Sequence, residues 1–168
     1  MTTRLLVAYA SRQGSTREVA EAIAAALRGH GLDAEVRAAA HVRGLEGYAG
    51  VVLGAAIYVG RLHGDARAFM RRHRRALAAL PLAVFALGPR TLAAGEVAAS
   101  RSQLDAALAR EPTLRPFSTA IFGGVVKPSE LRFPLNRMPA TDARDWDAIR
   151  RWADEIAARF ALAPGAVV

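Results

Sequence analysis

Residues 10–16 of this 168-residue chain read Ala10-Ser11-Arg12-Gln13-Gly14-Ser15-Thr16, a short polar segment between two apolar patterns. The run Leu5-Leu6-Val7-Ala8-Tyr9 precedes it, and after it Val19, Ile23 and Leu27 recur every four residues. A continuous apolar run is typical of a buried strand, and the four-residue spacing is typical of an amphipathic helix. The sequence therefore predicts a strand, a tight loop and a helix N-terminus in direct succession.

This loop has the chemistry of an anion-binding site. A helix N-terminus presents unpaired backbone N–H groups and the positive end of the helix dipole. Ser11, Ser15 and Thr16 add hydroxyl groups at the same place. Ser15 and Glu18 also match a capping box, a purely structural role that leaves the polar residues before Gly14 unexplained. We expect the loop to bind a phosphate group.

The rest of the chain alternates between strand and helix patterns. Further strands are expected over residues 33–38, 51–55, 82–87 and 118–126. Further helices are expected over 64–80, over 95–110 and after a cap at Asp142 or Asp145, with 127–139 as a loop. Strands that alternate with helices and are apolar throughout predict an α/β fold, in which helices cover both faces of a parallel sheet. We expect one domain over 1–168, ordered over about 3–162.

Composition narrows the function classes. The chain has no cysteine, which excludes disulfides, thiolate catalysis and cysteine metal sites. The N-terminal residues lead straight into a strand and no apolar run approaches a membrane span, so a cytoplasmic protein is expected. His63 and Asp65 lack a third metal ligand at suitable spacing, so no metal site is expected. No G-x-S-x-G motif supports a hydrolase.

Positive charge is concentrated in one segment of a chain whose formal net charge is +8. Residues 61–75 hold six arginines and one acid, Asp65. This face is either ordinary solvated surface or a docking face for an acidic protein, a carboxylate-bearing substrate or anionic lipid. Nucleic acid is not expected as a partner, because no aromatic residues are interleaved with the arginines. Membrane contact is expected to be at most peripheral, through residues 61–75 at the inner face.

Two further loops should meet the phosphate loop. In parallel sheets, ligands bind at the carboxyl ends of the strands, beside the first strand. The loops that follow the third and fourth expected strands, residues 55–61 and 87–90, converge there. Tyr58 is placed either to stack on a planar ring or to pack at the end of its strand.

The order and spacing of these segments resemble those of the flavodoxins. The phosphate loop of that family reads roughly T/S-x-T/D/x-G-x-T, and residues 11–16 match it. Within the superfamily, the chain is most similar to the menaquinone-dependent protoporphyrinogen oxidases and their flavodoxin-domain relatives. The segments that carry this likeness are Tyr9–Glu18, Val51–Tyr58, Phe69–His73 and Asp145-Trp146.

The resemblance implies a flavodoxin-like three-layer α/β sandwich with a five-stranded parallel sheet in the order 2-1-3-4-5, and FMN as the cofactor. It places three loops and a glycine pair at the cofactor. These residues are Ser11, Arg12, Gln13, Gly14, Ser15, Thr16, Ala55, Ala56, Ile57, Tyr58, Val59, Gly60, Leu87, Gly88, Pro89, Arg90, Gly123 and Gly124.

The function that the resemblance implies is an FMN-dependent oxidoreductase of heme biosynthesis, which oxidises protoporphyrinogen or a related substrate and uses a quinone as acceptor. No catalytic acid or base is assigned. Arg61 and Arg90, with Asp65 as the nearest acid in sequence, favour an anionic reduced flavin and hence two-electron transfer. The redox partner is expected to be a small molecule, a quinone or an acidic redox protein. One alternative function is a flavodoxin-type electron carrier with a basic docking face. The other is a flavodoxin-like binding module without flavin.

One departure from that branch lies before the last helix. The oxidases that the chain resembles carry a long, basic and aromatic insertion there, whereas the interval Lys127–Thr141 is short. It nevertheless keeps part of the insertion's character in Leu131, Arg132, Phe133, Leu135, Arg137 and Met138.

Overall fold

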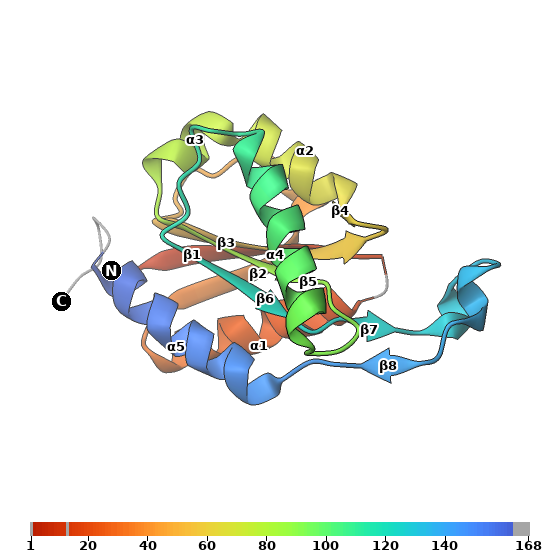
Figure 1. The fold of residues 1–168 in the computed structure, drawn as a ribbon. Helices are drawn as coiled ribbons and strands as arrows, with labels where there is room; N and C mark the ends of the chain where they lie inside the picture. Colours follow the sequence, from red (N-terminus) through yellow and green to blue (C-terminus); the bar gives the residue numbers. More distant parts are fainter. Residues whose placement is uncertain (1, 13, 163–168) are drawn as a thin grey trace.

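The computed structural model describes residues 2–12 and 14–162. Its sheet has the parallel order β2-β1-β3-β5-β6, with short β4 paired antiparallel to the end of β3 (Figure 1). With β4 set aside, this is the predicted order 2-1-3-4-5, which is confirmed. The strands are β1 (Arg4–Ala10), β2 (Asp33–Ala38), β3 (Gly50–Tyr58), β4 (Arg61–Leu62), β5 (Leu82–Leu87) and β6 (Ser118–Phe122).

Helices cover both faces of the sheet, as predicted. On one face lie α1 (Ser15–Gly29) and α5 (Trp146–Ala161), and on the other α2 (Gly64–Arg72), α3 (Arg74–Ala79) and α4 (Ala94–Ala109) (Figure 1). A short 3-10 turn, η1 (Ala39–His41), follows β2. Asp145 caps α5 by accepting a hydrogen bond from Ala148 N, which confirms one of the two expected caps.

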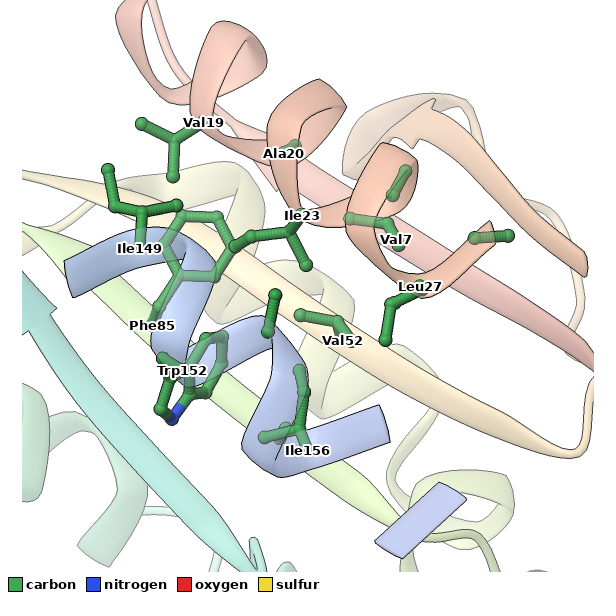
Figure 2. Close-up of a cluster of buried hydrophobic side chains, with 14 of the residues drawn as sticks. Val7, Val19, Ala20, Ile23, Leu27, Val52, Phe85, Ile149, Trp152 and Ile156 are labelled. Carbon is green, nitrogen blue, oxygen red and sulfur yellow. The ribbon is translucent and has the colours of Figure 1, made fainter. Parts of the chain in front are cut away.

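The core on the α1–α5 face is aromatic at its centre. Figure 2 shows Phe85 from β5 against Trp152 from α5, with Ile23 of α1 beside them. The Phe85 and Trp152 ring centroids lie 5.9 Å apart in an edge arrangement. Gly54 of β3 leaves the room for Phe85, because a Cβ at position 54 would overlap its ring. This packing fixes the strands whose carboxyl ends carry the site.

The expected helix over 64–80 is divided at His73, which ends α2 and precedes α3. The His73 side chain is buried, lies 4.9 Å from the Phe69 ring and has Nε2 3.3 Å from the Val42 carbonyl oxygen. This contact reaches a segment 31 positions away, so helix periodicity could not indicate it.

The expected strand over 118–126 was too long, and the expected loop over 127–139 has regular structure. The main strand β6 ends at Phe122. A Cβ at Gly123 would overlap the Ala143 carbonyl, so the chain crosses itself closely there. The next residues, β7 (Val125–Val126), pair antiparallel with β8 (Thr141–Asp142). They begin an arm, residues 125–142, which extends past the sheet and carries η2 (Pro128–Glu130) and η3 (Leu135–Arg137) (Figure 1).

Candidate functional site

The loop after β1 is built by a left-handed glycine. Gly14 has φ 77°, a conformation that side chains disfavour, and its carbonyl accepts the Glu18 N–H at 3.1 Å. Gly14 is therefore the N-cap of α1, and Ser15 is the first helical residue. The predicted capping box between Ser15 and Glu18 is wrong, because Ser15 lies one residue too far along and the Glu18 carboxylate binds Arg144.

The hydroxyl of Thr16 is buried and has no hydrogen-bond partner among the residues that the structure describes. It belongs to the first turn of α1, where backbone N–H groups also lack partners within the helix. A buried hydroxyl without a partner costs free energy, so such groups mark places where a ligand or water completes the bonding. This is the chemistry expected where a phosphate binds.

A cavity of about 500 Å³ lies beside this loop, at the carboxyl ends of the sheet strands. Three predicted loops and one residue of the predicted glycine pair line it together. The predicted residues in its wall are Ser11, Arg12, Ser15, Ala56, Ile57, Tyr58, Val59, Gly60, Leu87, Gly88, Pro89, Arg90 and Gly124.

The remaining predicted residues do not line the cavity or lie outside the described residues. Ala55 is fully buried within β3, Thr16 is fully buried in the first turn of α1, and Gly123 packs against Ala143. Gly14 shapes the loop through its backbone and does not line the cavity. Gln13 lies outside the described residues. Which of these residues bind a flavin stays a prediction.

The wall formed by residues 56–60 is a tight hairpin. Tyr58 of β3 pairs with Arg61 of β4, and both residues of the connecting turn have positive φ, 48° at Val59 and 73° at Gly60. A two-residue turn with positive φ at both positions matches the right-handed twist of the paired strands. A β-branched residue such as Val59 is strained in this backbone conformation. Val59 is 79% exposed, and the Arg12 guanidinium stacks 5.4 Å from the centroid of the Tyr58 ring. The hairpin thus presents an aromatic ring and an apolar tip at the cavity mouth.

Helix α4 supplies an acid that sequence analysis missed. Glu96 lines the cavity and lies 3.9 Å from Arg90. The Thr91 N–H donates a hydrogen bond to the Glu96 carboxylate, and this bond holds the pKa of Glu96 below its usual range. Arg61, which was expected beside the ring, does not line the cavity, whereas Arg12 does. The charges in the wall are therefore Arg12, Arg90 and Glu96.

Other lining residues also come from elements whose place the sequence pattern did not reveal. They are His63, Ala99, Ser100, Gln103, Val125, Val126, Leu135 and Met138. Those from α4 were hidden because that helix has no distinct apolar stripe. Val125 and Val126 were expected to continue the strand over 118–126, and Leu135 and Met138 fell in the segment expected to be a loop. The feature of the sequence that could have indicated a contribution of the arm to the cavity was the apolar and basic character of residues 131–138.

Arg144 ties the arm to the phosphate loop. Its side chain is only 9% exposed and donates hydrogen bonds to Glu18 at 2.7 Å and Asp142 at 2.8 Å. The same guanidinium lies 3.5 Å from the Ser15 carbonyl oxygen and 4.9 Å from the centroid of the Trp146 ring. Its hydrogen bonds hold the pKa of Asp142 below its usual range.

Comparisons with solved structures agree with this architecture. A flavodoxin from Streptococcus pneumoniae superposes with a TM-score of 0.60 at 19% identity, covering 93% of this chain and 99% of that one. Oxidised flavodoxin 2 from Bacillus cereus gives 0.59 at 20% identity, covering 94% and 97%. Rubredoxin oxygen:oxidoreductase from Desulfovibrio gigas gives 0.62 at 11% identity, covering 95% of this chain and 36% of the other. These likenesses establish the fold.

Sequence comparison indicates which branch of the superfamily the chain resembles. Protoporphyrinogen IX dehydrogenase [quinone] from Escherichia coli K12 is 32% identical over 89 residues, which are 50% of this chain. The match spans about half (48%) of that relative. It confirms the resemblance to this branch of the superfamily. No helix in the described part of the chain has the length and apolarity needed to cross a bilayer.

The family is established by a wider match. The family model described as Flavodoxin domain matches residues 6–138, which include the phosphate loop, the hairpin and most of the arm. Membership of this family implies a flavin cofactor. The chain belongs to the flavodoxin domain family.

Proposed function

We propose that this chain binds FMN and oxidises a reduced tetrapyrrole of the protoporphyrinogen type, with a quinone as electron acceptor. The observation that carries the cofactor assignment is the Thr16 hydroxyl, buried without a partner among the described residues at the N-terminus of α1. The name of the Escherichia coli relative supports the substrate and the acceptor.

The residues present fit FMN. Ser11, Ser15, Thr16 and the backbone N–H groups of the first turn of α1 would hold the phosphate. The hairpin at Tyr58 and the loop at Gly88 would flank the ring, since both line the cavity. A Cβ at Gly88 would overlap Ser100 Oγ and lie 3.1 Å from Ile57 Cδ1, so a larger residue would fill this part of the cavity. When bound, the flavin supplies the acceptance and release of electrons.

The protein contributes charge to the cavity and an imidazole that can carry a proton. Arg12 and Arg90 exceed the single acid Glu96 in the wall, and a positive surround favours a reduced, anionic ring. The His63 imidazole lines the cavity and its Nδ1 accepts the Asp65 N–H at 3.1 Å. In the neutral ring the proton is therefore on Nε2, and we assign His63 the role of proton carrier between substrate and solvent.

A second candidate function is electron transfer to a partner protein. The observation that favours it is the exposed basic face formed by Arg71, Arg72, Arg74 and Arg75. Such a face attracts an acidic redox protein, or anionic lipid at a membrane surface, at low ionic strength.

The deciding experiment starts from the absorption spectrum of the purified protein and identification of the extracted cofactor. The flavin-free protein is then titrated calorimetrically with FMN and with riboflavin. The difference between the two affinities gives the contribution of the phosphate group to binding. Turnover of protoporphyrinogen with a quinone supports the proposed enzyme. Rapid reduction by a flavodoxin reductase without such turnover supports the carrier, and a colourless protein that takes up no FMN contradicts both.

A further inference from the structure

A second hollow lies beside the main cavity. Its volume is about 490 Å³, and it lies between the hairpin and the outer part of the arm, open to solvent on one side. Arg12, Tyr58 and Leu135 line both spaces, so the two are adjacent. The other lining residues of the second hollow are Glu130, Leu131, Arg132, Phe133 and Pro134.

The lining of this hollow combines aromatic rings with uncompensated positive charge. Phe133 is 69% exposed and Tyr58 is 36% exposed, so both leave aromatic surface uncovered. Arg12 and Arg132 form no ion pair with any residue in the described ranges, in contrast to Arg90, which pairs with Glu96. Glu130 is the acid in this wall, so the two arginines leave a net positive charge.

The guanidinium groups are placed over the rings. Arg12 stacks on Tyr58 at 5.4 Å, and Arg137, which does not line the hollow, stacks on Phe133 at 5.1 Å. Such stacking leaves the N–H edge of a guanidinium free to bind a carboxylate, while the planar groups favour a flat apolar partner. An exposed phenylalanine beside an unpaired arginine suits a ligand that is aromatic at one end and anionic at the other.

We propose that this second hollow binds an aromatic carboxylate. The inference rests on the proposed function, in which this ligand is the reducing substrate of the adjacent cavity. Arg132 binds the carboxylate, and Phe133 and Leu131 cover the ring. Arg12 and Tyr58 line both spaces, so the bound molecule lies next to the main cavity. The binding step involves no flavin and is tested without turnover.

The test uses 2-naphthoate as the probe and its neutral amide as the matched ligand. Isothermal titration measures the dissociation constant of each for the protein, with and without saturating FMN. Arg132→Gln removes the charge that faces the hollow. Arg151→Gln removes the same charge from the exposed face of α5, outside both linings, and serves as the control.

The expected result is that Arg132→Gln weakens 2-naphthoate binding about tenfold, since a charge-assisted hydrogen bond is lost. The same variant should leave binding of the amide unchanged, and Arg151→Gln should affect neither ligand. Phe133→Ser should weaken both ligands.

Loss of 2-naphthoate binding when FMN is added would overturn the inference, because the probe would then occupy the main cavity. Equal affinity in Arg132→Gln and wild type would also overturn it. Failure of FMN to bind would contradict the proposed function alone, because the effect of Arg132→Gln on the probe is measured in the flavin-free protein too.

Discussion

The Arg144 guanidinium donates a hydrogen bond of 2.7 Å to the Glu18 carboxylate, joining two residues that lie 126 positions apart. Glu18 is in the first turn of α1, and Arg144 follows the last strand of the arm. The bond to Asp142 holds the base of the arm to the same guanidinium. The arm wall and the phosphate loop are thus fixed to each other through one side chain.

We expect Arg144→Gln to lower the free energy of unfolding by about 1–3 kcal/mol, because charge-assisted bonds to Glu18 and Asp142 are lost from a largely buried group. FMN affinity should fall as well, since the first turn of α1 loses its support. Urea unfolding and FMN titration measure the two effects. Arg150→Gln breaks an exposed pair with Asp147 and should change stability by less than about 1 kcal/mol. Equal behaviour of the two variants would contradict the role of Arg144.

Thr16→Val should separate ligand binding from stability. The Thr16 hydroxyl has no partner among the described residues, so its removal should leave the flavin-free protein as stable as wild type or more stable. If the hydroxyl binds phosphate, affinity for FMN should fall about tenfold while affinity for riboflavin stays the same. Calorimetry with the two ligands checks this. An equal loss for both ligands would argue against a phosphate contact.

Gly54→Ala should be strongly destabilising, by about 3 kcal/mol or more, because the added Cβ would overlap the buried Phe85 ring. The strand around Gly54 pairs on both sides and has little freedom to move away. Gly29→Ala, at the last residue of α1 with no atom near the added Cβ, is the matched control and should be neutral or slightly stabilising. Thermal unfolding of both variants decides whether Gly54 is a packing requirement.

His73 should make stability depend on pH. Burial is the main cause that lowers the pKa of His73 from its ordinary value near 6.5, and Arg72 lowers it further, while the Val42 carbonyl and Glu46 oppose the shift. The unfolded chain therefore binds the proton more readily, so this contribution is fully present above about pH 6.5. It is lost as the pH falls from there through the folded-state pKa.

The change that tests this is His73→Gln, whose amide can still donate to the Val42 carbonyl. Its free energy of unfolding should vary less than that of wild type between about pH 5.5 and 7.5. This range lies above the ordinary pKa values, 4.5 for Glu35 and Glu96 and 3.8 for Asp142, at which these carboxylates titrate in the unfolded chain. Urea unfolding across this range measures the difference. Parallel pH curves for the two proteins would show that His73 does not contribute.

Much of the sheet and the meeting of its loops could be predicted from the sequence. The runs at residues 5–9 and 82–87 are apolar throughout, and strands at both places are buried as expected. Because parallel strands bring their carboxyl ends to one edge, the polar residues after each run had to converge, and the cavity wall joins Ser11, Tyr58 and Pro89.

Features that depend on distant partners could not be predicted. The sequence pattern places Gly123-Gly124 in a strand, but in the structure Ala143 packs closely against Gly123. The arm forms only because Val125 pairs with Asp142. Glu96 enters the cavity wall only because α4 packs beside β3 and β6.

The sequence by itself thus determined the layers and the loop edge at which a phosphate is expected, since hydrophobic periodicity and turn chemistry are local properties. The strand order followed from the resemblance of the sequence to the flavodoxins. Only the tertiary structure decided the break at His73, the link from Arg144 to Glu18 and the second hollow beside Tyr58. Each of these depends on a contact between residues far apart in the chain, and such contacts leave no periodic pattern.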